Sequence, residues 1–192
     1  MMKKTPLVMM LLLGLSPSAF ADWELLNDES SLHYVSIKST NIAEMNSFKT
    51  LTGSVSDEGA VSLNINLASV ETHIPIRNER MQEMLFEVGQ FAEANITGDV
   101  DLARVEKLDV GETYTDSITL KLSLHGESND VTSGVQITKL AGGKMLVSSL
   151  EPVIINAENY KLAAGVEALR EIAGLQAVST VVPVTYSLVF KQ

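Results

Sequence analysis

Residues 118–125 read Ile-Thr-Leu-Lys-Leu-Ser-Leu-His, and their pattern indicates the class of fold. The apolar side chains fall at every second position, with Thr, Lys, Ser and His between them. Successive side chains of a β-strand point to opposite faces, so this period of two predicts a strand with one apolar and one polar side. A helix would repeat its apolar residues every three or four positions instead.

The same alternation recurs along the chain. Residues 61–67 and 182–190 show it most clearly, and further candidate strands cover residues 32–39, 48–56, 96–105, 131–140 and 145–156. Asp-Glu-Gly at 57–59 and Ala-Gly-Gly at 141–143 separate such runs and are typical of hairpin turns. Many strands joined by short turns predict one all-β domain, an antiparallel sandwich or barrel.

Two segments have helical spacing. Pro75 opens the first, where Met81, Met84, Leu85 and Val88 lie at i, i+3, i+4 and i+7. The second covers residues 163–173. Two interpretations of the first helix remain open. It could cap the end of a barrel with its arginines in solvent, or Arg77 and Arg80 beside a methionine-rich face could mark the mouth of an apolar cavity.

The amino terminus has the pattern of a secretory signal. Lys3 and Lys4 precede an apolar run at 7–15, and Ala-Phe-Ala at 19–21 supplies the small residues of a cleavage site. We therefore expect a signal peptide at 1–21, a single domain at 22–192, and a location outside the cytoplasm. No later stretch approaches the ~20 apolar residues of a spanning helix, so we expect the mature chain not to span a membrane.

Composition narrows the choice of partners. The chain has 14 basic and 24 acidic residues and no cysteine. Without Lys3 and Lys4, 12 basic residues remain against 24 acidic ones, a net charge of −12. Such a charge argues against binding nucleic acid or an anionic lipid surface. The lack of cysteine excludes disulfides, thiol catalysis and thiolate metal sites.

No pattern of catalytic residues stands out. His33, His73 and His125 lie far apart, none with a partner at metal-ligand spacing. A Gly-x-Ser-x-Gly elbow and a phosphate-binding glycine loop are both missing. The acidic residues at 28–29 and 99–101 are interpreted as exposed loop acids. We therefore predict no metal, no cofactor and no enzymatic activity.

Four stretches, taken in order, resemble the YceI-like family, also described as polyisoprenoid-binding or lipocalin-like. They are Phe-Lys-Thr-Leu-Thr-Gly at 48–53, Ser-Val-Glu-Thr at 69–72 with Arg-Asn-Glu-Arg-Met at 77–81 and Leu-Phe at 85–86, Leu-Lys-Leu-Ser-Leu-His-Gly-Glu-Ser at 120–128, and Val-Val-Pro-Val-Thr-Tyr-Ser-Leu-Val-Phe at 181–190. Two positions depart from the family pattern. Asn46 stands where glycine is usual, and Asn78 follows Arg77 where the family has aspartate.

The resemblance implies an antiparallel, eight-stranded, lipocalin-like barrel with one or two short capping helices. It also implies a long apolar bore that holds an isoprenoid or fatty-acyl lipid in the periplasm, for transport or storage. Alternation and the helix face assign these residues to the bore: Leu63, Ile65, Met81, Met84, Leu85, Phe86, Leu120, Leu122, Tyr186 and Leu188.

Alternatives to a lipid-binding protein remain open at this point. The chain could be an enzyme that acts on such a lipid, which would need a polar site. It could also be a structural barrel filled by its own side chains, with no ligand. The sequence leaves open whether two copies pair as a homodimer.

Overall fold

The structure, a computed structural model, describes residues 22–192, so the predicted signal peptide at 1–21 lies outside it. Among the described residues, twelve strand segments form one antiparallel sheet. They are β1 Trp23–Leu25, β2 Ser31–Lys38, β3 Ile42–Phe48, β4 Leu51–Val55, β5 Ala60–Asn66, β6 Val70–Glu71, β7 Glu93–Asp99, β8 Thr113–Leu124, β9 Glu127–Leu140, β10 Lys144–Ser149, β11 Val153–Asn156 and β12 Val181–Lys191.

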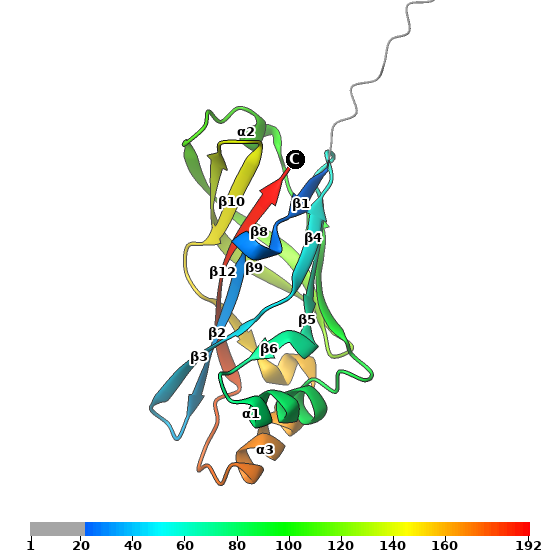
Figure 1. The fold of residues 1–192 in the computed structure, drawn as a ribbon, viewed down its shortest axis with the longest axis vertical. Coiled ribbons are helices and arrows are strands. Elements are labelled where there is room, and N and C mark those ends of the chain that lie inside the picture. The colour runs from blue at the N-terminus through cyan, green and yellow to red at the C-terminus, as the bar shows by residue number, and fades with distance from the viewer. Residues whose placement is uncertain (1–21) are drawn as a thin grey trace, which may run out of the picture.

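The sheet closes into a barrel because β12 pairs with two shorter strands along each of its edges. β10 and β11 lie along one edge, and β1 and β2 lie along the other. β1 also pairs with β4, which leads through β5, β7, β8 and β9 back to β10. When each interrupted strand is counted once, residues 22–192 form the predicted eight-stranded antiparallel barrel (Figure 1).

The longest hairpin, β8 with β9, shows why alternating residues build this wall. On its inner face Leu120 lies opposite Val131, and both line the interior. On its outer face Thr119 and Thr132 join their hydroxyls at 2.7 Å, and Lys121 forms an ion pair with Asp130 at 3.0 Å. Apolar pairs therefore face inward and polar pairs face water, as the period of two predicts.

Short helices lie at both ends of the barrel (Figure 1). At one end are α1, Pro75–Arg80, which continues as a π-helical turn, Met81–Leu85, and α3, Ala163–Ile172. We call this set the helical cap. At the opposite end lies α2, Ala103–Glu106. Within residues 22–192 no helix has the length and apolar character needed to cross a membrane.

Several predicted boundaries are wrong. The strand expected at 96–105 ends at Asp99, and the remainder forms a loop and α2. The strand expected at 145–156 is two strands separated by residues 150–152. The strand expected at 48–56 begins at Leu51, and the sequence analysis did not predict β1 or β3. On β3 the positions of Glu44 and Asn46 are polar, since Glu44 bonds to Arg77 of α1 and Asn46 bonds to Ser36 of β2, so the apolar alternation is missing there.

The barrel interior is only partly filled by its own side chains. Val135, on β9, and Leu51, on β4, are 0% and 2% exposed and form its tightly packed part. Val135 lies on the inward row of β9 between Ser133 and Ile137, which line an open space. The interior is therefore packed in places and hollow in others.

Candidate functional site

An apolar cavity of about 300 Å³ lies inside the barrel. Inward residues of the strands form its sides. The helical cap, with Met81 and Leu85, and Phe86 directly after it close one end, and the segment around α2 closes the other with Leu102 and Val105. The described lining contains only six residues with polar side-chain atoms: Tyr34, Asp101, Tyr114, Asp116, Ser133 and Tyr186. Such a cavity suits an apolar ligand.

Most of the residues assigned to the bore do lie in the cavity wall. The lining includes Leu63, Ile65, Met81, Leu85, Phe86, Leu120, Leu122, Tyr186 and Leu188. Met84 is not part of it. Met84 is half-buried where the π-helical turn packs against α3, with its carbonyl oxygen facing Gly165. The structure places these residues in the cavity wall. Their contact with a ligand stays a prediction.

Three polar side chains along the bore, those of Ser133, Tyr186 and Tyr34, are neutral and hydrogen-bonded. The Oγ of Ser133 and the phenol oxygen of Tyr186 are 2.9 Å apart, and burial raises the pKa of Tyr186. Near the helical cap, the phenol of Tyr34 donates to the sulfur of Met81 at 3.8 Å. Burial also raises the pKa of Tyr34. Both phenols therefore stay protonated at neutral pH, and this part of the bore carries no charge.

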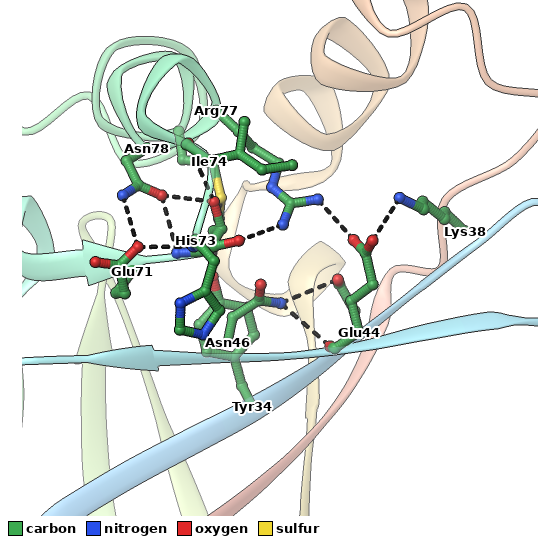
Figure 2. A network of polar contacts seen from close by, with 12 residues as sticks. Tyr34, Lys38, Glu44, Asn46, Glu71, His73, Ile74, Arg77 and Asn78 are labelled. Atoms are coloured by element: carbon green, nitrogen blue, oxygen red, sulfur yellow. Dashed lines mark hydrogen bonds and ion pairs between the residues drawn. The ribbon is translucent and has the colours of Figure 1, made fainter.

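Arg77 ties the helical cap to the barrel (Figure 2). Its guanidinium donates to Glu44 on β3 at 2.6 Å and to the carbonyl oxygen of Thr72 at 2.6 Å. Lys38 donates to the other carboxylate oxygen of Glu44 at 2.7 Å. The hydrogen bond from Lys38, together with that from Arg77, lowers the pKa of Glu44. Charge-assisted bonds of this kind position α1 over the end of the barrel.

Neither arginine predicted at the cavity mouth belongs to the cavity lining. Arg77 is engaged with Glu44 and Thr72, and Arg80 is half-buried with no side-chain hydrogen bond or ion pair to any residue of 22–192. Two further buried atoms of the network, Nε of Arg77 and Oδ1 of Asn46, have no hydrogen-bond partner within the same range. A mouth at this end stays a prediction.

Asn78 explains one departure from the family pattern. Its Oδ1 accepts from both the N–H and the hydroxyl of Thr72, at 2.9 and 2.5 Å, while its Nδ2 donates to Glu71 at 3.1 Å (Figure 2). An aspartate here could accept from Thr72 but could not donate to Glu71, and the two carboxylates would repel. The threonine and the asparagine of this motif thus have a structural role at the start of α1.

The three histidines lie at three separate points. His33 is on β2, opposite Thr185 and Ser47, and His73 is in the turn before α1. His125 is in the β8–β9 turn, where its Nε2 lies 2.8 Å from Glu87. Within residues 22–192 no group of three His, Cys, Asp or Glu side chains could hold a metal ion. The absence of a metal remains a prediction about the purified protein.

The sequence analysis missed the end of the cavity at α2. It assigned residues 96–105 to one strand and interpreted residues 99–101 as loop acids. In the structure Asp101, Leu102 and Val105 all contribute to the lining, and the Asp101 side chain accepts from the N–H of Ala103. A signal was present, because an aspartate before an apolar pair spaced three apart is typical of the start of a short helix.

A closed antiparallel barrel with an apolar interior and helices across its ends defines the class of lipocalin-like barrels. Within that class, the YceI-like domain matches residues 23–190, and the chain belongs to this family. No protein with a curated description matches it in sequence.

Two solved structures are similar to it. One is a polyisoprenoid-binding domain from Saccharophagus degradans implicated in plant cell wall breakdown, with 37% identity, a TM-score of 0.86, and coverage of 88% of this chain and 97% of that one. The other is BcnA from Burkholderia cenocepacia, with 19% identity, a TM-score of 0.66, and coverage of 86% and 98%. At 19% identity the second likeness concerns the fold alone.

Proposed function

We propose that the protein binds the apolar tail of a long isoprenoid lipid inside its barrel and carries or stores that lipid in the periplasm. The observation that supports this most is the cavity of about 300 Å³ with an almost entirely apolar wall. That volume is at the lower end of the range for small-molecule sites and suits a slim ligand. The similar domain from Saccharophagus degradans, which is described as polyisoprenoid-binding, supports the choice of an isoprenoid.

The energetics set a minimum length for the tail. Each buried methylene group contributes ~0.8 kcal/mol, so a five-carbon unit contributes roughly 3–4 kcal/mol. Loss of translational and conformational freedom on binding costs about 4–15 kcal/mol. A single unit therefore should not bind measurably, whereas a tail of several units should.

Mass spectrometry of an organic extract of the purified protein tests the proposal directly. We expect a lipid with a long apolar tail at close to one molecule per chain. Titration of delipidated protein with isoprenoid alcohols of one and of several units should show binding only of the longer ones. An extract without lipid, together with no binding at any tail length, would contradict the proposal.

The periplasmic part of the proposal rests on residues 1–21, outside the described structure. Ala-Phe-Ala at 19–21 predicts cleavage before Asp22. Amino-terminal sequencing of protein recovered from the periplasm should therefore begin at Asp22. A start at Met1 would contradict both the cleavage and the compartment.

A further inference from the structure

Residues 101–110, here called the strap, cross the end of the barrel opposite the helical cap (Figure 1). The backbone is fastened on both sides of the strap. The N–H of Val100 donates to Gly59 at 2.9 Å, and the N–H of Gly111 donates to Lys139 at 2.8 Å. Within the described chain, residues 101–110 hydrogen-bond only with one another and with Glu112. The strap is thus anchored at its ends and free of hydrogen bonds to the barrel between them.

Two apolar side chains of the strap pack into the end of the barrel. Leu102 is 9% exposed, Val105 is 3% exposed, and both line the cavity. The other residues of the strap are exposed apart from Leu108, which is half-buried. A segment with few buried contacts and without hydrogen bonds to the neighbouring strands opens at a low cost in free energy.

The barrel wall beside the strap is incomplete. β7 and β8 pair at only three positions within residues 22–192: Asn95 with Ser123, Ile96 with Leu122, and Thr97 with Lys121. The first part of β8, from Thr113 to Leu120, therefore has no strand partner on its β7 side. In this part of β8, the N–H of Ser117 donates a hydrogen bond to Oδ1 of Asp116 at 2.8 Å. Displacement of the strap breaks no pairing between strands.

Two weak contacts of the Arg104 side chain join the strap to β8. Arg104 lies 4.2 Å above the ring centre of Tyr114 and 3.8 Å from the carboxylate of Asp116. Both charged side chains are about half exposed, where such contacts are weak. Asp101 and Asp116 are also the charged residues of the described lining, and both are exposed, so the cavity wall reaches solvent-exposed side chains here. At the other end, Arg77 holds the cap in place through a part-buried ion pair with Glu44 and a hydrogen bond to the carbonyl oxygen of Thr72.

We propose that the strap is the door of the cavity: it swings out about its two anchors to admit and release the lipid tail, while the helical cap stays closed. This proposal rests on the proposed function, since it concerns the path of the same ligand. It places the door at the end opposite Arg77 and Arg80.

Because the chain has no native cysteine, introduced cysteines can be used to cross-link the strap to the barrel specifically. Arg104→Cys with Asp116→Cys, joined by a bismaleimide with a cleavable internal disulfide, fixes the strap to β8. As the matched control, Gln82→Cys with Ala68→Cys fixes the helical cap, because the Gln82 amide donates to the Ala68 carbonyl at 2.8 Å. Each variant serves as its own reference before linking and after reduction of the linker.

The readout is the transfer of radiolabelled geranylgeraniol from loaded protein to phosphatidylcholine vesicles. Linking the strap should slow transfer by more than roughly tenfold, since lid opening then limits release, and reduction should restore it. Linking the cap should leave the rate unchanged. Transfer that is slowed by the cap link, or unaffected by the strap link, would overturn the proposal.

Hydrogen exchange on the unlinked, ligand-free protein separates this proposal from the proposed function. Amides of residues 101–110 should exchange faster than those of residues 75–85. If the strap amides exchange as slowly as those of residues 75–85, or more slowly, the strap is not the entrance, even if lipid binds. Fast exchange with no binding of geranylgeraniol would contradict the proposed function and leave a mobile strap that serves another ligand.

Discussion

Glu71 joins three neighbours at the place where the helical cap begins. Its carboxylate accepts from Lys49. It also accepts from Asn78 and from the N–H of His73 at 2.7 Å (Figure 2). These bonds, with that of Lys49 first, lower the pKa of Glu71 to about 2. An unfolded glutamate has a pKa of about 4.3. Ionised Glu71 therefore stabilises the fold above that pH, and this contribution is lost as the pH falls toward about 2.

We predict that Glu71→Gln lowers the free energy of unfolding at pH 7 and that its deficit against wild type shrinks between pH 4.5 and 2. Urea unfolding at several pH values measures this. Glu79→Gln is the matched control, because the exposed Glu79 side chain makes no hydrogen bond or ion pair within residues 22–192. A deficit of Glu71→Gln that stays constant with pH would contradict the assignment.

Substitution of Leu122 tests whether the lipid occupies the bore. It is 8% exposed and lines the cavity. Leu122→Glu would set an unpaired carboxylate against hydrocarbon, which costs several kcal/mol or forces the group to stay protonated. We predict that this variant loses its lipid, as measured by mass spectrometry of organic extracts.

Thr97→Glu is the control for Leu122→Glu. Thr97 is exposed on the neighbouring strand, opposite Lys121, so an added carboxylate there meets a cation and water. It should keep its lipid. Both variants must first show a retained β-sheet signal in circular dichroism. A folded Leu122→Glu protein with as much lipid as wild type would place the lipid elsewhere.

At the scale of elements, α3 docks through a glycine. A β-carbon added at Gly165 would lie 2.7 Å from the carbonyl oxygen of Met84 and 2.8 Å from the Cα of Leu85, both backbone atoms. Backbone cannot move aside as a flexible side chain can. The absence of a side chain at Gly165 therefore allows α3 to approach the π-helical turn so closely.

We predict that Gly165→Ala destabilises the protein, although alanine favours helices by about 1 kcal/mol. Overpacking of this kind costs about 1–3 kcal/mol. In the control Gly89→Ala, the added carbon meets no atom within 4 Å, and the change in unfolding free energy should stay within about 0.5 kcal/mol. Urea unfolding measures both variants. A Gly165→Ala protein more stable than wild type would mean that α3 lies farther from the turn.

At the scale of the whole molecule, a partly hollow barrel should depend on its ligand for stability. A ligand present at about a hundred times its Kd stabilises the folded state by roughly 2.7 kcal/mol. For a domain of this size, each kcal/mol shifts the Tm by about 2–4 °C. We predict that delipidation lowers the Tm by roughly 5–10 °C and that added isoprenoid alcohol restores it. Calorimetry that gives equal Tm values with and without lipid would favour a self-filled barrel.

The sequence determined by itself which strands have an apolar side and which residues lie on it. Leu63, Leu122 and Leu188 are on different strands, and each was assigned to the inner face before any pairing was known. This is possible because the alternation of side chains is a local property of extended backbone. The helices at Pro75 and at Ala163 were predictable for the same reason, since spacing and end signals are local.

Only the tertiary structure decided what the polar residues do. Arg77 was expected at a cavity mouth, but its partner Glu44 lies on β3, a strand without apolar alternation. Likewise, residues 101–105 became a loop and the start of a helix because β8 leaves β7 after three pairs, and Leu102 and Val105 cover the open end. Such roles depend on groups brought together by closure of the barrel, and the local pattern of a sequence does not contain those distances.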